Sequence, residues 1–442
     1  MWLYDGLSLF RSPKLHRTLK PADVKTEEPA LDTTGMTGAP LYYDCATDDA
    51  RLTLETALDA VKAGALVVTH ARVRSFVKDA RGRITGAMVE DTQTGTLQEV
   101  KASAVVNATG PWTDETIAMS GPLAGGPLLR PTKGVHIVVD REKLPVNHAV
   151  VAMHPKDGRV LFAIPWGERS YVGTTDTDHD GDPREVAATR EDVDYLIDAC
   201  ASYFPKHPLT HADVIATWAG LRPLMAPPEH GEGEVSESKI SREHRIVVGQ
   251  DGLVTIAGGK LTTYRRMAGE VVDTVVNLLR LDDKLPGKLV APRTDEEPLP
   301  GAVGWPEDDD HARVAAQIRA ASSQRLSEAS ARLLADTYGM RGLDVAKRVA
   351  KDADLATALV EGRPEVLAQV DHAVEKELAH RVSDVMIRRT QLFYKDVDQG
   401  LAATGLVAER MATLLGWDAE RTGVEIAAYQ ADVARSRRWR EG

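Results

Sequence analysis

Two short stretches of the sequence combine residue types that hold phosphates and other electron-rich groups in enzymes. Residues 105–112 and 256–265 each join an apolar, β-branched run to a turn of small residues, and a helical pattern follows each turn. The first backbone N–H groups of a helix have no partner within the helix, so they attract anionic or electron-rich ligands. The two turns together predict an enzyme that binds a dinucleotide.

A dinucleotide-binding domain must position these turns on a parallel sheet. Its first strand-turn-helix normally carries a G-x-G-x-x-G motif, which grips the pyrophosphate. The 442 residues contain no such motif. We therefore expect the glycine-rich segment to come from elsewhere, either from an upstream continuation of the chain or from a separate N-terminal polypeptide.

Composition narrows the class of protein. The formal net charge of -12 argues against nonspecific nucleic-acid binding, which requires a positive surface. Cys45 and Cys200 form no C-x-x-C motif, so neither a disulfide framework nor a zinc site is indicated, and the cytoplasm is the expected compartment. No run of about 18 apolar residues occurs, so we expect no spanning helix and at most a peripheral membrane contact.

Hydrophobic periodicity predicts a helix followed by strands before the first turn. Leu54, Leu58 and Val61 share one face of a helix over residues 48–62, and Gly64 lies where a left-handed cap belongs. Alternating and β-branched residues predict strands at Leu66–His70, Val73–Val77, Ile84–Val89 and Leu97–Val100.

A second group of strands predicts a substrate sheet of mixed or antiparallel type. Its members are His136–Val139, Ala149–Met153, Val160–Ile164 and Ser170–Gly173. A helix near residues 191–203 and a polar loop over residues 227–242 follow. After Pro286 a proline-rich linker leads to a helical region, in which residues 308–310, Ser327 and Ser383 are expected helix caps and Gly339 a stop.

Seven motifs, in order, occupy residues 43–52, 107–112, 133–139, 164–166, 173–176, 221–224 and 258–265. Their residue types and spacing resemble the FAD-dependent glycerol-3-phosphate dehydrogenases of the aerobic, quinone-reducing type. The resemblance extends over essentially the whole chain. It implies an α/β fold of the glutathione-reductase or amino-acid-oxidase type, N-terminally truncated, with a mixed β substrate sheet and an all-α C-terminal domain.

The resemblance also implies how the chain is divided. We expect residues 1–112 and 245–285 to form the remainder of an FAD-binding domain, 113–244 a substrate-binding domain, 286–306 a linker and 307–442 a helical domain.

The implied reaction is the oxidation of sn-glycerol 3-phosphate to dihydroxyacetone phosphate by FAD, with a membrane quinone as the electron acceptor. Oxygen is the alternative acceptor, as in an oxidase. Because the glycine-rich motif is absent, a second alternative is a catalytically silent remnant, or one half of a split enzyme. Quinone reduction would place the chain at the inner face of the cell membrane, as a peripheral protein on an anionic surface.

Three side chains are candidates for the chemistry. Arg222 precedes Pro223, and its planar guanidinium suits bidentate phosphate binding, whereas Lys260 follows two glycines and can approach a ligand closely as a point charge. A surface salt bridge is the alternative role of either cation. His136 is a candidate proton acceptor because imidazole titrates near neutral pH, although a histidine within a strand is often structural. The remaining histidines, including His372 and His380, are expected to be solvated.

The two turns are the implied FAD contacts. The contacting residues would be Ala108, Thr109, Gly110, Gly258, Gly259, Lys260, Leu261 and Thr262. Thr262 or Thr263 would cap the following helix, on which Met267, Val271 and Val275 share a face. The positive end of that helix would stabilise negative charge on the reduced flavin.

Two further features favour plainer interpretations. Residues 176–181 begin like a calcium-binding EF-hand loop, but Ala187 stands where the closing glutamate belongs, so we expect an acidic loop and no metal site. The basic end, Arg435–Arg440, and the amphipathic start, Trp2–Phe10, are candidate contacts with anionic lipid; a solvated helix end is the alternative for the former.

Overall fold

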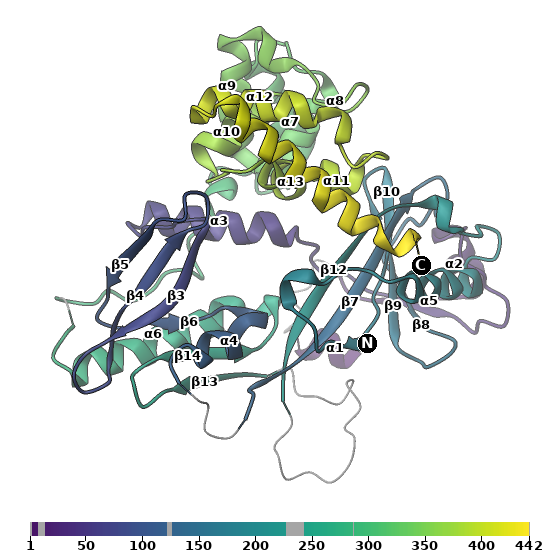
Figure 1. Ribbon diagram of the computed structural model, residues 1–442. Coiled ribbons are helices and arrows are strands. Elements are labelled where there is room, and N and C mark those ends of the chain that lie inside the picture. Colours follow the sequence, from purple (N-terminus) through teal and green to yellow (C-terminus); the bar gives the residue numbers. More distant parts are fainter. Residues whose placement is uncertain (1, 8–13, 122–125, 227–242, 286, 442) are drawn as a thin grey trace.

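The computed structural model describes residues 2–7, 14–121, 126–226, 243–285 and 287–441. Figure 1 shows a six-stranded sheet on one side, two three-stranded sheets with helix α3 (Asp49–Lys62) on the other, and a layer of helices above both. The C-terminal part of the chain forms this layer. No helix of the described residues is both long and apolar enough to cross a membrane.

The six-stranded sheet contains β7 (Leu129–Asp140), β8 (Val150–Met153), β9 (Val160–Trp166), β10 (Arg169–Gly173), β11 (Thr177–Asp178) and β12 (Val214–Met225). The strand order is β11-β7-β10-β9-β8, and β12 also pairs with β7. All of these pairings are antiparallel, which is one of the two predicted arrangements. Val135, Ile137 and Val139 of β7 are fully buried in one core with residues of α5 (Arg190–Tyr203). Because side chains alternate along a strand, Gly134 and His136 belong to the opposite face.

Both predicted turns lie where a strand leads into a helix. One of the two three-stranded sheets has the strand order β13-β14-β6. Its strands are β13 (His244–Val248), β14 (Val254–Gly258) and β6 (Val106–Asn107). Helices α4 (Thr113–Ala118) and α6 (Tyr264–Leu281) follow β6 and β14. The predicted meander is confirmed as the antiparallel strands β3 (Ala71–Lys78), β4 (Ile84–Asp91) and β5 (Leu97–Lys101).

Helix α3 begins and ends as predicted. The side chain of Asp48 accepts the backbone N–H of Arg51 at 3.0 Å, which satisfies one of the unpaired donors at the start of the helix. Gly64 follows the last turn with a φ of 97°, in the left-handed region that glycine adopts at low cost.

The predicted strand over Leu66–His70 is wrong. These residues have no regular secondary structure, and Leu66 and Val68 are 90% and 61% exposed. β-branched residues favour a strand only where another strand pairs with them and covers a face. In the part of the chain that the structure describes, no strand pairs with this stretch.

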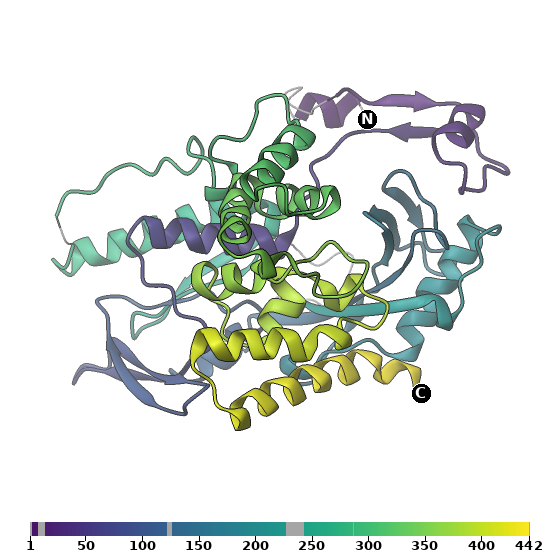
Figure 2. The same ribbon diagram turned by 90° about the horizontal axis from the view of Figure 1, so that it is seen from above.

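The N-terminal arm contains α1 (Trp2–Leu7), β1 (Arg17–Leu19), α2 (Pro21–Glu27) and β2 (Ala39–Leu41). In Figure 2 this arm (purple) lies on the opposite side of the molecule from the last helices (yellow). The Glu28 carboxylate accepts the backbone N–H groups of Asn147 and His148, each at 2.9 Å, which ties the arm to the substrate sheet. The end of the predicted piece Trp2–Phe10 and the polar loop at 227–242 lie outside the described residues.

The helical layer contains α7 (His311–Ala321), α8 (Glu328–Tyr338), α9 (Gly342–Lys351), α10 (Ala368–Lys376), the π-helical turn η9 (Asp384–Arg389), α11 (Leu392–Lys395), α12 (Thr404–Leu415) and α13 (Ala419–Arg437). Asp310 and Ser327 cap α7 and α8 through their side chains, and Gly339 ends α8 with a φ of 57°, as predicted. The predicted cap at Ser383 is wrong, because its hydroxyl donates to Asp432 at 2.6 Å instead.

A buried charge network joins α3 to this layer. Arg51 donates to both carboxylate oxygens of Glu377, at 3.0 and 2.9 Å, and to Glu55 at 3.0 Å. Arg341 donates to Glu55 at 2.6 Å, and His372 lies 3.5 Å from Glu377. Burial alone would raise the pKa of Glu377, but His372 and Arg51 lower it to about 2. His372 is only 1% exposed, so its predicted solvation is wrong.

We expect Arg51→Met to destabilise the protein by about 3–5 kcal/mol, because it leaves the buried carboxylate of Glu377 without its main partner. The contribution of the pair is complete above about pH 4.5 and is lost as the pH falls toward 2, since the folded state holds the Glu377 pKa low. Thermal and urea unfolding at pH 7 measure the loss.

The matched control is Arg348→Met, which breaks a more exposed pair with Glu375 and should cost about 1 kcal/mol or less. Equal losses in the two variants would contradict a special role of the buried network.

Candidate functional site

The two turns lie side by side because their strands are parallel neighbours. Val254 pairs with Val106 and Thr255 with Asn107 in the parallel ladder of β14 and β6. The carboxyl ends of both strands therefore open at one edge of the sheet, where ligands bind in open α/β sheets. This arrangement brings together the predicted FAD contacts of residues 108–110 and 258–262.

The first turn is held by the side chain of Asn107, which is 1% exposed. Its amide donates to the Thr113 carbonyl at 3.1 Å, and its oxygen accepts the Thr109 hydroxyl at 2.7 Å. Gly110 then adopts a φ of 58° and begins the short 3-10 helix η1 (Gly110–Trp112). The turn is thus fixed in shape before any ligand binds.

The second turn requires both of its glycines. Gly258 and Gly259 have φ values of 76° and 92°, and an added Cβ would lie 2.6 Å from the Glu243 carbonyl oxygen and 2.4 Å from Met267, respectively. A side chain at either position would therefore strain the backbone and push a neighbour aside. Two glycines in succession let the backbone approach a ligand closely, which fits a flavin at this edge.

The capping prediction for α6 is wrong. The N-cap position belongs to Thr263, but its hydroxyl donates to the Lys260 carbonyl at 3.0 Å, and no side-chain cap is formed. Thr262 lies within the 3-10 turn η5 (Leu261–Thr263), which precedes α6. The first N–H groups of the helix are therefore not satisfied by a capping side chain.

His136 lies on the open face of the six-stranded sheet among aromatic rings. Its imidazole stacks on Trp218 at 5.0 Å between ring centroids and meets the edge of Tyr171 at 5.9 Å. Gly173 lies beneath it, since an added Cβ there would be 2.1 Å from the ring. The Nδ1 atom of His136 is buried and has no hydrogen-bond partner among the residues that the structure describes.

Arg222 comes from β12 and lies over the same face. Its guanidinium covers Gly134, where an added Cβ would be 2.6 Å away, and it donates to Asp176 at 3.0 Å and to the Thr174 hydroxyl at 2.9 Å. Arg222 is therefore already paired with a carboxylate oxygen. Its side chain is 28% exposed, which leaves it accessible to a ligand.

Lys260 is not in direct contact with the other two candidates. Its side chain is exposed, and among the described residues it forms no hydrogen bond or ion pair. Strands β12 and β14 nevertheless contact each other, and an added Cβ at Gly258 would lie 3.1 Å from Met225 of β12. The structure thus places Arg222 and the second turn on adjoining elements.

The sequence analysis missed the aromatic surroundings of His136. Trp218 and Tyr171 are in contact with it, and Tyr394 of α11 meets Trp218 at 5.3 Å from the helical layer. The alternation Trp218, Gly220, Arg222 would have placed the first and last on one face of a strand. The pairing of Trp218 with His136 depends on strand register, which the sequence does not display.

The acidic loop is engaged by arginines. Arg222 pairs with Asp176, and Arg130 pairs with Asp178 through two hydrogen bonds. In the described ranges, no group of His, Cys, Asp and Glu side chains is arranged to hold a metal ion.

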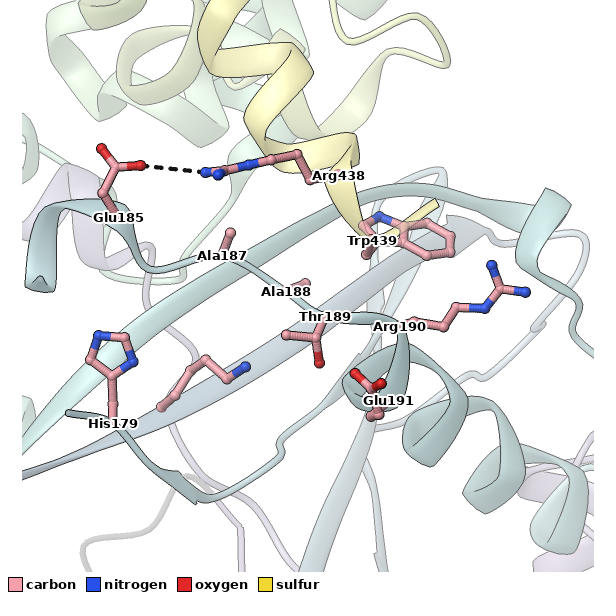
Figure 3. Close-up of a pocket in the computed structure, with 10 residues that line it drawn as sticks. His179, Glu185, Ala187, Ala188, Thr189, Arg190, Glu191, Arg438 and Trp439 are labelled. Carbon is pink, nitrogen blue, oxygen red and sulfur yellow. Dashed lines mark hydrogen bonds and ion pairs between the residues drawn. The ribbon is translucent and has the colours of Figure 1, made fainter. Parts of the chain in front are cut away.

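The basic C-terminal end packs on the substrate sheet through one buried ring, while the side chain of Arg438 stays 53% exposed. Trp439 is 3% exposed and belongs to the core of the substrate sheet, and Arg440 donates to the Val214 carbonyl at 2.8 Å. Arg438 lies 3.4 Å from Glu185, and both residues line a cavity of about 460 Å³. Figure 3 shows Arg438 pointing toward Glu185. Lys133, which also lines this cavity, pairs with Asp192 at 2.6 Å. The cations Arg438 and Lys133 of this cavity are thus each paired with a carboxylate.

The sequence is similar to known protein families over most of its length. Residues 5–265 match the family described as FAD dependent oxidoreductase, and residues 292–422 match the C-terminal domain of alpha-glycerophosphate oxidase. The aerobic glycerol-3-phosphate dehydrogenase of Staphylococcus haemolyticus is 35% identical over 416 residues, which are 94% of this chain and 72% of the relative. The chain belongs to the FAD-dependent glycerol-3-phosphate dehydrogenase family.

Two further glycerol-3-phosphate dehydrogenases are similar to this chain. The glycerol-3-phosphate dehydrogenase of Mycobacterium leprae is 35% identical over 433 residues, covering 98% of this chain and 70% of the relative. The crystal structure of the glycerol-3-phosphate dehydrogenase from Bacillus halodurans complexed with FAD is 30% identical and has a TM-score of 0.78, covering 95% of this chain and 79% of that one. The predicted family, fold class and FAD cofactor are confirmed. The domain boundaries and site residues stay predictions.

Burial lowers the pKa of His136 to about 4, and the nearby cation of Arg222 contributes to the shift. We expect a histidine NMR titration to show His136 neutral above about pH 5. Arg222→Gln removes the second cause only, so it should raise the midpoint part of the way toward 6.5, the ordinary value for histidine.

Arg81→Gln, a change in the exposed β3–β4 turn, is the control and should leave the midpoint in place. A midpoint that falls or stays constant in the Arg222 variant would show that this cation does not act on the imidazole.

Proposed function

We propose that this chain oxidises sn-glycerol 3-phosphate to dihydroxyacetone phosphate with FAD and passes the electrons to a membrane quinone. The observation that carries the proposal is the shared sheet face of Arg222 and His136, beside the two turns that fit a flavin. The relatives are named glycerol-3-phosphate dehydrogenases, which supports the substrate.

The reaction divides among groups with distinct tasks. The chemistry that a bound FAD would supply is acceptance of the hydride from the secondary alcohol. Arg222 binds the phosphate in place of Asp176, as a charge-assisted fork. His136 is neutral at physiological pH and so has a ring nitrogen able to accept the hydroxyl proton. The ammonium of Lys260, which has no ion-pair partner among the described residues, lies at the second turn and supplies a second positive charge.

The electron acceptor is the finer part of the proposal. The relatives include proteins named as aerobic dehydrogenases, which favours a quinone over oxygen. Turnover that releases one hydrogen peroxide per substrate oxidised, without added quinone, would assign the chain to the oxidases instead.

We propose a peripheral attachment to the membrane for delivery to quinone. The basic end Arg435–Arg440 is a poor candidate for the contact, because its side chains bond within the protein. Leu7, at the end of α1, is 76% exposed and offers an apolar contact on the N-terminal arm.

We expect Arg222→Gln in the FAD-loaded enzyme to lower kcat/KM for glycerol 3-phosphate by about 10- to 100-fold, the usual effect of losing a charge-assisted hydrogen bond. Activity toward glycerol, which lacks the phosphate, should change far less. Steady-state kinetics with both substrates measure the difference.

Arg130→Gln breaks a neighbouring Arg–Asp pair on the same sheet and serves as the control, with nearly unchanged kinetics toward both substrates. The phosphate role of Arg222 is refuted if its variant loses activity toward glycerol and glycerol 3-phosphate equally.

We also propose that a glycine-rich polypeptide segment outside these residues completes the FAD site. Val106 of β6, at the edge of its sheet, is 41% exposed, and the apolar stretch at Leu66–His70 has no strand partner in the described structure. On α6, Val272 is 57% exposed. An unpaired edge next to exposed apolar side chains is a surface that a further strand would cover.

The 442-residue polypeptide alone should therefore be colourless and poorly soluble. Adding a G-x-G-x-x-G segment, fused or as a separate chain, should restore the flavin absorbance and glycerol 3-phosphate oxidation. A fused protein that binds FAD but stays inactive would favour the silent-remnant alternative. Stoichiometric FAD on the 442 residues alone would show that the segment is not needed.

A further inference from the structure

A cavity of about 250 Å³ lies between the edge strand β12 and the helical layer. Its walls come from four places that are distant in sequence: residues 184–188, β12, the stretch from η9 to α11, and α13. Trp218 forms part of the wall, and the same indole stacks on His136. The cavity therefore adjoins the candidate active site but is separated from it by this ring.

The cavity is lined by three arginines and a single carboxylate. Arg184, Arg388 and Arg435 come from three different elements, and Asp432 is the acidic residue among the lining side chains. Arg435 pairs with Asp432 at 2.7 Å, whereas the partners of Arg184 and Arg388 lie outside the lining. Arg184 has two carboxylate partners, Glu115 and Asp182. A guanidinium has five N–H donors, so each of the three arginines keeps donors for a ligand.

Tyr394 adds a neutral donor to the same wall. Its ring is held edge-on by Trp218 at 5.3 Å and by Phe393 at 4.9 Å. Within the described part of the chain its hydroxyl has no hydrogen-bond partner. Burial raises the pKa of Tyr394 to about 12, so the phenol keeps its proton and can donate it to an acceptor in the cavity.

We propose that this cavity binds a small phosphate monoester through its phosphate group. Donors from three directions suit a tetrahedral dianion with three acceptor oxygens better than a flat carboxylate. The volume equals that of about eight water molecules in the liquid, which admits a phosphate and a few carbon atoms. The apolar rings of Trp218 and Phe393 then contact the carbon part of the ester.

The test is isothermal titration calorimetry with inorganic phosphate. It uses the Arg222→Gln protein, in which the proposed substrate site no longer binds phosphate. We expect one binding event, weakened about 10- to 100-fold by Arg435→Gln and about 2- to 10-fold by Tyr394→Phe, the latter being a change that keeps the ring packing. Arg438→Gln, which alters a neighbouring arginine outside this cavity, is the control and should leave binding unchanged.

Unchanged phosphate affinity in both the Arg435 and Tyr394 variants would overturn the proposal. Sedimentation with phosphatidic acid vesicles that requires Arg435, without calorimetric binding of free phosphate, would overturn it as well and assign the cavity to a lipid headgroup. Because the background already lacks Arg222, failure here leaves the proposed reaction untouched.

Discussion

The buried ion network around Glu377 is the constraint on which the arrangement of the molecule depends. An isolated carboxylate in a protein interior is very costly, so Glu377 can be buried only with Arg51 at hydrogen-bond distance. That requirement fixes α3 against the end of α10. Glu55, one turn further along α3, accepts the Gly301 N–H at 2.9 Å and so fixes the linker as well. Three segments distant in sequence thus meet through one set of charges.

The helical layer, held in this way, completes the surroundings of the open sheet face. The Lys395 carbonyl accepts hydrogen bonds from Arg169 of β10 and from Arg363, so α11 lies directly over the sheet. Tyr394 consequently packs on Trp218, and Trp218 on His136. The imidazole packs against Trp218, Tyr171 and Gly173, and burial is the larger cause of its low pKa. The helical layer thus contributes to the surroundings of His136 through Trp218.

Local structure was well predicted from the sequence, and long-range pairing was not. The cap and stop of α3, the meander and both turns follow from short patterns that act within a few residues. The stretch Leu66–His70 has the composition of a strand, but a strand needs a partner, and composition does not supply one. The basic end resembled a surface helix because its arginines are conspicuous, whereas the buried ring of Trp439 determines where it lies.

The candidate site shows the same division. Its residue types could be predicted, since Arg222, Lys260 and His136 each follow a recognisable local pattern. The structure places Arg222 and His136 on one face of the sheet. The network of Arg51 and Glu377 joins residues 326 positions apart, and no local sequence pattern predicts it. What escapes a single sequence is therefore the set of contacts that fix the environment of a site, and with it the pKa values on which chemistry depends.

The ion pair between Arg222 and Asp176 lies beside His136, and the Arg222 cation helps to lower the pKa of that imidazole. Under the proposed function, a phosphate dianion replaces Asp176, whose side chain is 18% exposed and can return to water at modest cost. The dianion also offsets the positive charge that helps to lower the pKa of His136, so the pKa rises when substrate binds. Burial, the larger cause, persists, so the imidazole stays neutral at physiological pH yet becomes a stronger base in the complex. Under the proposed function, Arg222 thus both holds the phosphate and makes the basicity of His136 depend on whether the site is filled.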